Sequence, residues 1–314
     1  MIAPVDEPIL HHYPQSPFSE KVRLAFGAKR MAWRSVHIPV MLPKPDVLAL
    51  TGGYRKTPIL QVGADVYCDS ALICRWVEAQ VSEPTLYPAA QAALSEMLAQ
   101  WADSTLFWTA VPFTTRSPGA MAALFPGAAA ETFKAFGADR AAFAPHVPRL
   151  ALHDGDVALG HYLGWLESLL ADGRAWIAGD ALSIADLSVA HPLWFMRQGG
   201  IGARLDARPR LAAWLERVLA LGHGSSTPTT SDAAVALAAS THVHAPTRVE
   251  PGLGFEAGEP VTVAATDYGS DPVHGTLVGL GAHRVTLERR DPRAGTVHVH
   301  FPRIGFGIRK ETST

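Results

Sequence analysis

Three short motifs near the start of the chain place polar side chains where backbone groups are free to bind a ligand. They are Ser16 in the segment 16–19 (SPFS), the dipeptide Thr57-Pro58, and the dipeptide Asp69-Ser70. The first and the third stand where helices are expected to begin, and helix starts expose N–H groups that bind anions. The motifs therefore predict a site for a small peptide, built mainly from backbone groups, with Ser16 facing the group that is activated.

The elements that position these motifs alternate between strand and helix signals. Apolar spacing predicts strands at 9–13, 35–38, 59–62 and 65–67, helices at 19–28 and 70–81, and a loop or irregular helix at 42–53. Gly63-Ala64 between two of these strands is typical of a hairpin. The order βαβ, crossover, ββα predicts a thioredoxin-like domain over residues 1–86.

Residues 87–221 are rich in Ala and Leu and lack strand signals, which predicts an all-helical domain. Ser183 and Asp186 have the spacing of a capping box, in which the hydroxyl bonds the third helical amide and the carboxylate reaches back to the cap. We therefore interpret Asp186 as structural. Residues 209–221 predict a further helix, whose inward side chains are Leu211, Trp214, Leu215 and Val218.

Trp101 and Trp108 are one heptad apart and are expected on one helix face, with Leu98 and Thr105 extending the stripe. As an apolar wall beside the motifs, Trp101, Thr105 and Trp108 are candidates to line a pocket. The same spacing is also typical of a buried core stripe, so both interpretations stay open.

The chain changes character after residue 221. Residues 222–239 predict a linker rich in Gly, Ser, Thr and Pro, followed by a short Ala-rich helix at 232–239. Five short strands separated by turn signals are expected at 261–265, 275–280, 284–290, 296–301 and 305–309. We assign residues 240–314 to a small SH3-like β-barrel.

Histidines gather near these strands. His298 and His300 share one strand face, and His242 and His244 lie just before the strands. An HxH pair can bind metal, but no third ligand at a defined spacing is visible, so we predict no metal site.

Composition excludes several classes of protein. The chain has 314 residues, 48% of them hydrophobic and 18% charged, which is typical of a globular rather than a disordered protein. A net charge of -2 gives no reason to expect nucleic acid or an anionic membrane as a partner. Cys68 and Cys74 suggest a reducing compartment and buried, apolar roles. The first residues lack the pattern of a signal peptide, so we expect a soluble cytoplasmic protein.

Taken in order, four segments resemble those of cytosolic glutathione transferases. They are 16–23 (SPFSEKVR), 57–60 (TPIL), 69–73 (DSALI) and 183–186 (SIAD). The resemblance covers roughly residues 8–221 and implies a thioredoxin-like domain followed by a helical domain. The tail lies outside the usual plan of the family.

The resemblance implies roles for the matching positions. Pro58 would be cis, and the Thr57 backbone would pair with the cysteinyl unit of glutathione. Asp69 would face the ammonium of the γ-glutamyl end, while Ser70 would bind its carboxylate. The full set of implied glutathione-binding residues is Ser16, Phe18, Lys44, Lys56, Thr57, Pro58, Asp69 and Ser70, with the two lysines meeting the glycyl carboxylate.

Ser16 is the residue that the resemblance implies as the activator of the thiol. Lowering a thiol pKa of about 8.5 by about two units requires about 2.7 kcal/mol, and one hydrogen bond to a charged group supplies about 1.5–3 kcal/mol. Tyr13 is the alternative activator. Ser16 could instead be only a helix cap, although Ser19 is the better candidate for that role.

These features predict a glutathione transferase that directs the thiolate at a small hydrophobic electrophile, with glutathione as co-substrate. A lyase, isomerase or dehalogenase that uses glutathione is also compatible with the site. The alternative is a non-catalytic, transferase-like scaffold whose C-terminal barrel recruits a protein partner. The family resemblance also implies a homodimer.

Overall fold

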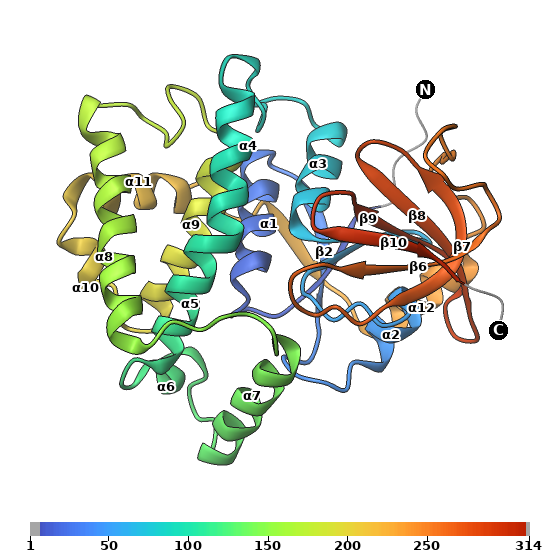
Figure 1. Ribbon diagram of the computed structural model, residues 1–314, viewed down its shortest axis with the longest axis horizontal. Helices are drawn as coiled ribbons and strands as arrows, with labels where there is room; N and C mark the ends of the chain where they lie inside the picture. Colours follow the sequence, from blue (N-terminus) through green and yellow to red (C-terminus); the bar gives the residue numbers. More distant parts are fainter. Residues whose placement is uncertain (1–6, 312–314) are drawn as a thin grey trace.

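One ten-stranded sheet joins the N-terminal and C-terminal parts of the chain. The computed structural model describes residues 7–311, and the order of strands in the sheet is β10-β6-β7-β8-β9-β4-β3-β1-β2-β5. Figure 1 shows the C-terminal strands on the right and the helical region on the left. Residues 1–6, on which the expectation of a chain without a signal peptide rests, lie outside the described residues.

The predicted thioredoxin-like arrangement is present at the centre of this sheet. Its elements are β1 (Ile9–His12), α1 (Pro17–Ala28), β2 (Ala32–His37), α2 (Pro45–Thr51), β3 (Ile59–Val62), β4 (Asp65–Cys68) and α3 (Ser70–Gln80). β1 pairs parallel with β2 and antiparallel with β3, and β3 pairs antiparallel with β4. Side chains alternate across a strand, so Leu10 enters the core beneath α1 and α3 while Ile9 enters the core beneath α2.

The helical region follows the prediction over residues 89–219. Its elements are η1 (Ala89–Gln91), α4 (Ala92–Trp101), the π-helical turn η2 (Ala102–Leu106), α5 (Phe107–Arg116), α6 (Ala120–Leu124), α7 (Ala130–Phe143), α8 (Leu152–Leu169), η3 (Leu170–Asp172), α9 (Ile184–Gln198), α10 (Ala203–Asp206) and α11 (Pro209–Leu219). All four side chains predicted to face inward from α11 are buried. Among residues 7–311, no helix is both long and apolar enough to cross a membrane.

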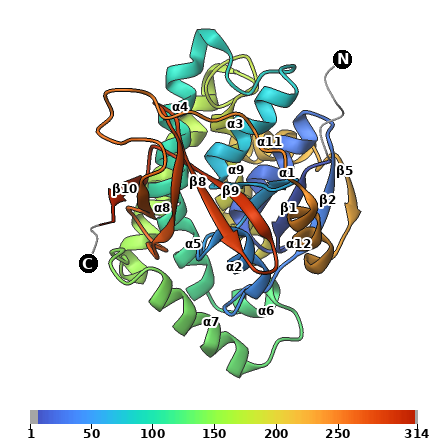
Figure 2. The same cartoon turned by 90° about the vertical axis from the view of Figure 1, so that its right-hand side faces the viewer.

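The predicted linker after residue 221 is wrong in part, because it contains an edge strand. β5 (Ser225–Pro228) pairs parallel with β2. Side chains hold it in place: Trp33 Nε1 donates to the His223 carbonyl at 2.7 Å, and Arg34 donates to Thr229 Oγ1 at 2.7 Å. The predicted Ala-rich helix is α12 (Ser231–Ser240), which returns across the sheet beside α2 (Figure 2).

All five predicted C-terminal strands are present, but they do not stand apart as a separate unit. They are β6 (Pro260–Ala265), β7 (Val273–Leu280), β8 (Arg284–Asp291), β9 (Gly295–Pro302) and β10 (Phe306–Lys310). Consecutive strands β6 to β9 pair antiparallel, and β10 returns to pair with β6. The outer edge of β9 pairs parallel with β4, so these strands extend the thioredoxin-like sheet. No β9–β10 pairing closes a barrel within the described residues, and the expected SH3-like barrel is not confirmed.

This junction has a simple physical cause. The edge of β4 carries backbone N–H and C=O groups that need partners, and an open edge invites pairing with another strand. β9 supplies those partners over Asp65–Tyr67, opposite His298–His300. The C-terminal strands therefore share a core with one face of the thioredoxin-like domain.

Candidate functional site

A cavity of about 310 Å³ opens beside the first residues of α1, between the thioredoxin-like domain, helices α5 and α7, and the loop after β6. Its walls are mainly aromatic. The aromatic lining residues are Tyr13, Phe18, Phe107, Trp108, Phe125, Phe133, Phe136, Phe143, Phe195 and Tyr268. Of the residues predicted from the sequence, Tyr13, Ser16, Phe18, Lys56, Thr57 and Trp108 line it.

Ser16 lies at the N-cap of α1, and the prediction that Ser19 is the cap is wrong. Ser16 Oγ accepts a hydrogen bond from Ser19 N at 3.2 Å, because Ser16 has the extended backbone of a cap (φ -73°, ψ 119°). A hydroxyl can accept and donate at once. Within residues 7–311 the Ser16 hydroxyl has no acceptor for its proton, so it can donate to a ligand in the cavity.

The other two motifs lie at a cis peptide bond and at the start of a helix. The Thr57-Pro58 peptide bond is cis. Asp69 is the N-cap of α3, and its carboxylate accepts from Ala71 N at 2.8 Å. Its φ of 78° lies in the left-handed region, which a non-glycine residue adopts rarely and at a cost in free energy. Pro58 follows the lining residue Thr57 in the chain, but Pro58, Asp69 and Ser70 do not themselves line the cavity.

The two candidate lysines have different surroundings. Lys56 Nζ forms an ion pair with Asp267 at 2.6 Å and lies 4.1 Å from the centre of the Tyr268 ring. Lys44 Nζ donates to Thr57 Oγ1 at 3.2 Å and, among the residues that the structure describes, has no carboxylate within 4.0 Å. Burial, together with the nearby positive charge of Arg140, lowers the pKa of Lys44 to about 8. Of the two lysines, Lys56 lines the cavity and is paired, whereas Lys44 has no ion-pair partner among the described residues but does not line the cavity.

The predicted stripe of Trp101, Thr105 and Trp108 is broken by the π-helical turn η2. In this turn Phe107 N bonds to the Ala102 carbonyl five residues back, so the chain takes more residues per turn and the helix phase shifts. Trp108 lines the cavity, whereas Trp101 packs edge-on against Tyr162 at 5.5 Å. Thr105 is exposed. Hence only one of these three side chains reaches the cavity.

The loop between β6 and β7 supplies a cavity wall that the sequence did not reveal. Tyr268 packs edge-on against Trp108 at 4.9 Å and against Phe143 at 5.1 Å. Gly269 N donates to the Phe143 carbonyl at 2.8 Å, which fastens the loop to the end of α7. Residues 269–272 were predicted only as a turn between strands. No local signal placed that turn against a helix more than a hundred residues earlier.

Both cysteines are free and buried, as expected from the sequence. Burial raises the pKa of the Cys68 thiol well above its usual range and that of the Cys74 thiol to about 12. Neither thiol lines the cavity. Ser16 and the alternative activator Tyr13 both line the cavity at the start of α1.

The fold and the arrangement at the start of α1 define a class of protein. Residues 10–85 match the family model described as "Glutathione S-transferase, N-terminal domain", and residues 145–217 match "Glutathione S-transferase, C-terminal domain". A solved structure of a GST-like protein from Pseudomonas syringae is 42% identical, with a TM-score of 0.80. That match covers 98% of this chain and 100% of the other. The chain belongs to the glutathione S-transferase family.

Two further similar proteins match a smaller part of this chain. A glutathione S-transferase from Rhodospirillum rubrum F11 is 23% identical with a TM-score of 0.53, over 68% of this chain and 87% of that one, which supports the fold alone. FtsZ-localized protein A from Caulobacter vibrioides (strain NA1000 / CB15N) is 29% identical over 193 residues, covering 60% of this chain and 76% of that protein. The Pseudomonas match extends over the C-terminal strands, because it leaves only a small fraction of this chain uncovered.

Proposed function

We propose that this protein is a glutathione transferase in which Ser16 stabilises the glutathione thiolate for attack on an aromatic electrophile. One observation carries the proposal: the buried Ser16 hydroxyl, whose proton has no acceptor within residues 7–311, opens into an aromatic cavity beside Thr57. The start of α1 adds the favourable field of a helix N-terminus. Titration calorimetry with glutathione tests the first step, and no binding at millimolar glutathione would contradict it.

The cavity walls support an aromatic second substrate that carries a negative charge. Arg55, Arg116, Arg140 and Arg149 line the cavity, and within the described residues no Asp or Glu does. Arg55 and Arg140 are paired with Asp139, so Arg116 and Arg149 are the arginines that offer their charge to a substrate. Arg116 donates to the Pro112 and Leu150 carbonyls and has no ion-pair partner in the part of the chain that the structure describes. Conjugation is the reaction we propose. Lyase, isomerase and dehalogenase activities remain alternatives for the same site.

Lys44→Ala will weaken the binding of S-methylglutathione about tenfold or more at pH 7. A charge-assisted hydrogen bond contributes about 1.5–3 kcal/mol, and the variant loses it. In the wild type the affinity will fall as the pH rises from 7 to 9, because free Lys44, with a pKa of about 8, loses the proton that the carboxylate requires. Calorimetry across this range measures both effects, and the missing thiol keeps its ionisation out of the titration.

The variant should lose the part of this pH dependence that Lys44 contributes and keep the part that comes from the ammonium of the ligand, whose ordinary pKa is about 8. Lys310→Ala is the control. Lys310 is the last residue of β10, pairs with Glu259 and does not line the cavity. Equal affinities for the Lys44 variant and the wild type would remove Lys44 from the site.

Tyr268→Ala will raise KM for 4-chloro-3-nitrobenzoate about two- to tenfold, because the Tyr268 ring lines the cavity and an aromatic contact with the substrate ring contributes about 0.5–1.5 kcal/mol. Steady-state kinetics at saturating glutathione give this value, and thermal unfolding shows whether the variant is folded. Tyr268→Phe retains the ring and should keep the wild-type KM. An unchanged KM in the Ala variant would mean that the loop after β6 does not contact the second substrate.

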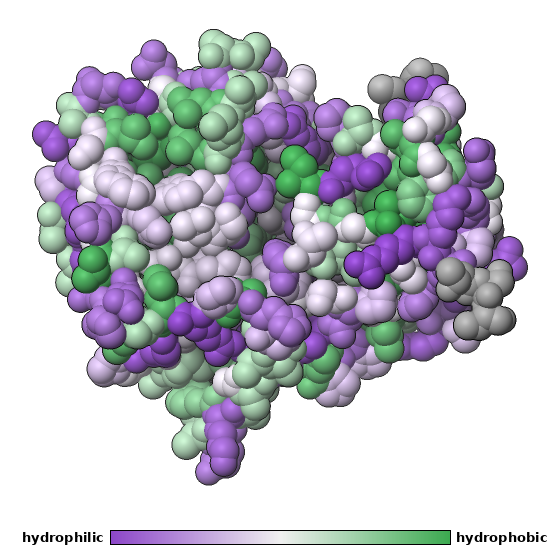
Figure 3. Space-filling view, viewed as in Figure 1, coloured by the Kyte–Doolittle hydropathy of each residue, from purple (hydrophilic) through white to green (hydrophobic). Residues whose placement is uncertain are grey.

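The family is typically dimeric, and we propose that this chain forms a homodimer. Leu94 and Met97 on α4 are 47% and 70% exposed. Figure 3 shows apolar residues gathered near the upper end of this helix. Light scattering of the full chain measures the mass in solution.

The second candidate function is a scaffold that binds a protein partner. It is supported by the C-terminal strands, which extend the sheet beyond the 68% of the chain matched by the Rhodospirillum enzyme, and by the similarity to FtsZ-localized protein A. The test uses the full chain, since β9 pairs with β4. Conjugation that Ser16→Ala abolishes supports the enzyme, whereas partner capture without glutathione binding supports the scaffold.

A further inference from the structure

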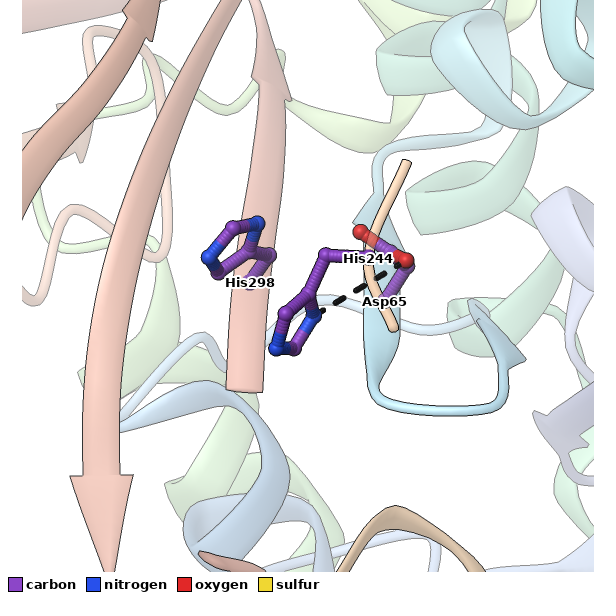
Figure 4. Close-up of side chains that lie close together, drawn as sticks. All are labelled: Asp65, His244 and His298. Atoms are coloured by element: carbon purple, nitrogen blue, oxygen red, sulfur yellow. Dashed lines mark ion pairs between the residues drawn. The ribbon is translucent and has the colours of Figure 1, made fainter. Parts of the chain in front are cut away.

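A cluster of one carboxylate and two imidazoles lies where the C-terminal strands meet the thioredoxin-like sheet. Asp65 begins β4, His298 lies in β9, and His244 precedes β6. One ligand atom from each residue lies within 4.8 Å of the other two. Figure 4 shows the two rings stacked beside the carboxylate. None of the three side chains lines the aromatic cavity, so the cluster is separate from the glutathione site.

Each of the two imidazoles has a buried nitrogen without a partner, whereas the Asp65 carboxylate accepts hydrogen bonds from His300 Nε2 and Ala245 N. The side chains of Asp65, His244 and His298 are only 7%, 16% and 11% exposed. Nδ1 of His244 and Nδ1 of His298 are both buried and have no hydrogen-bond partner within residues 7–311. A buried polar atom without a partner costs about 1–3 kcal/mol, and folded proteins contain few of them. A cation beside the carboxylate would give both nitrogens the partner that they lack.

Neighbouring residues orient these groups as they do around bound metals. Asp65 Oδ1 accepts from His300 Nε2 at 2.7 Å, and His300 Nδ1 lies 3.0 Å from Thr286 Oγ1. The carboxyl of Glu288 lies 3.7 Å from Nε2 of His298. A carboxylate on one ring nitrogen keeps the proton there and leaves the other nitrogen free to bind a metal.

We propose that Asp65, His244 and His298 bind a divalent transition-metal ion through two imidazole nitrogens and one carboxylate oxygen, with water completing the coordination. Zinc and iron(II) both accept this donor set. The ion would connect three segments that are distant in the sequence. It would thereby fasten the C-terminal strands to β4.

Binding requires one local movement. His244 Nδ1 lies 4.0 Å from Asp65 Oδ2, whereas two ligand atoms on one tetrahedral zinc lie about 3.3 Å apart for bonds of about 2.0–2.1 Å. The His244 ring must therefore turn out of its stack on His298, where the ring centres are 3.8 Å apart. His244 lies outside the helices and strands, so its ring can turn without breaking a strand ladder.

The test uses the full chain without a histidine tag, freed of metal by a chelator and then dialysed. Zinc is titrated by calorimetry, and cobalt(II) is added separately so that its visible absorption reports the ligand set. We expect one ion per chain and a thermal unfolding midpoint that rises with zinc. His244→Gln and His298→Gln should each weaken zinc binding at least tenfold and remove the rise in the midpoint.

His242→Gln is the matched control, because His242 is exposed and only two residues from His244. It should bind zinc as the wild type does. The proposal is overturned if the wild type binds no zinc, if the His242 variant loses as much affinity as the His244 variant, or if the cluster only takes up protons as the pH falls. His244 lies in a loop, so the His244 variant decides the question even where the His298 variant fails to fold.

Discussion

Replacing Ser16 with Ala will lower kcat/KM for glutathione conjugation by about 10- to 100-fold in a protein that still folds. In the proposed site the Ser16 hydroxyl donates to the thiolate, and such a bond to a charged group contributes about 1.5–3 kcal/mol. Ser16 Oγ also accepts from Ser19 N, so the substitution removes a helix cap as well. A lost cap lowers the free energy of unfolding by about 0.5–2 kcal/mol. Steady-state kinetics and urea unfolding measure the two effects separately.

The ionisation of bound glutathione distinguishes catalysis from capping. Titration of the thiolate absorbance should show the pKa of the bound thiol rising by about one to two units in the Ser16 variant. Thr230→Ala is a matched control, because Thr230 Oγ1 accepts from Ala233 N at 3.1 Å as the cap of α12, outside the cavity. This control should lose comparable stability and keep its activity. A Ser16 variant as active as the wild type would leave Ser16 with the capping role alone.

Asp186→Ala will lower the free energy of unfolding by at least about 4 kcal/mol. Asp186 is fully buried and accepts four hydrogen bonds, from Ile177 N at 2.7 Å, Ser183 N at 2.9 Å, Ser183 Oγ at 3.0 Å and Trp214 Nε1 at 2.9 Å. The substitution leaves these donors in the core, where each unpaired group costs about 1–3 kcal/mol. Asp186 thus joins the start of α9 to α11, through Trp214, and to the segment before α9, through Ile177.

Urea unfolding followed by circular dichroism measures this loss. A capping box alone predicts only about 0.5–2 kcal/mol, so the bonds from Ile177 and Trp214 account for the larger effect. Asp172→Ala is the control: its carboxylate also accepts a backbone N–H, from Arg174 at 3.0 Å, but its side chain is 56% exposed. That variant should change stability by no more than about 0.5 kcal/mol. A loss below about 2 kcal/mol for Asp186→Ala would contradict the structural role assigned to this residue.

Features that depend on neighbouring residues could be predicted. Ser183 and Asp186 predict the start of α9, because a capping box joins residues three apart. The alternation of apolar and polar residues predicts β6 to β10, and the apolar spacing of 209–221 predicts the buried face of α11. The three motifs around Ser16, Thr57 and Asp69 likewise stand at the junctions where the structure places them.

Other features were missed because their cause lies elsewhere in the chain. β5 is a strand because β2 offers it an open edge, although its own residues are typical of a linker. The π-helical turn η2 rotates Trp101 away from Trp108, and no residue within it signals the change of period. Asp65 gave no sign of being the third partner of His244 and His298, because β4 and β9 meet only in the folded chain.

Capping, turn geometry and side-chain alternation act over a few residues, and for that reason the family and the order of elements were already present in the sequence. Pairing of open strand edges and contacts between loops act between residues far apart. Lys56 and Asp267, which form an ion pair across 211 positions, are the plainest case. This pair and the neighbouring Tyr268 make the C-terminal strands part of the cavity wall. Only the folded chain brings these residues together, because the pairing of β9 with β4 joins the C-terminal strands to the thioredoxin-like sheet.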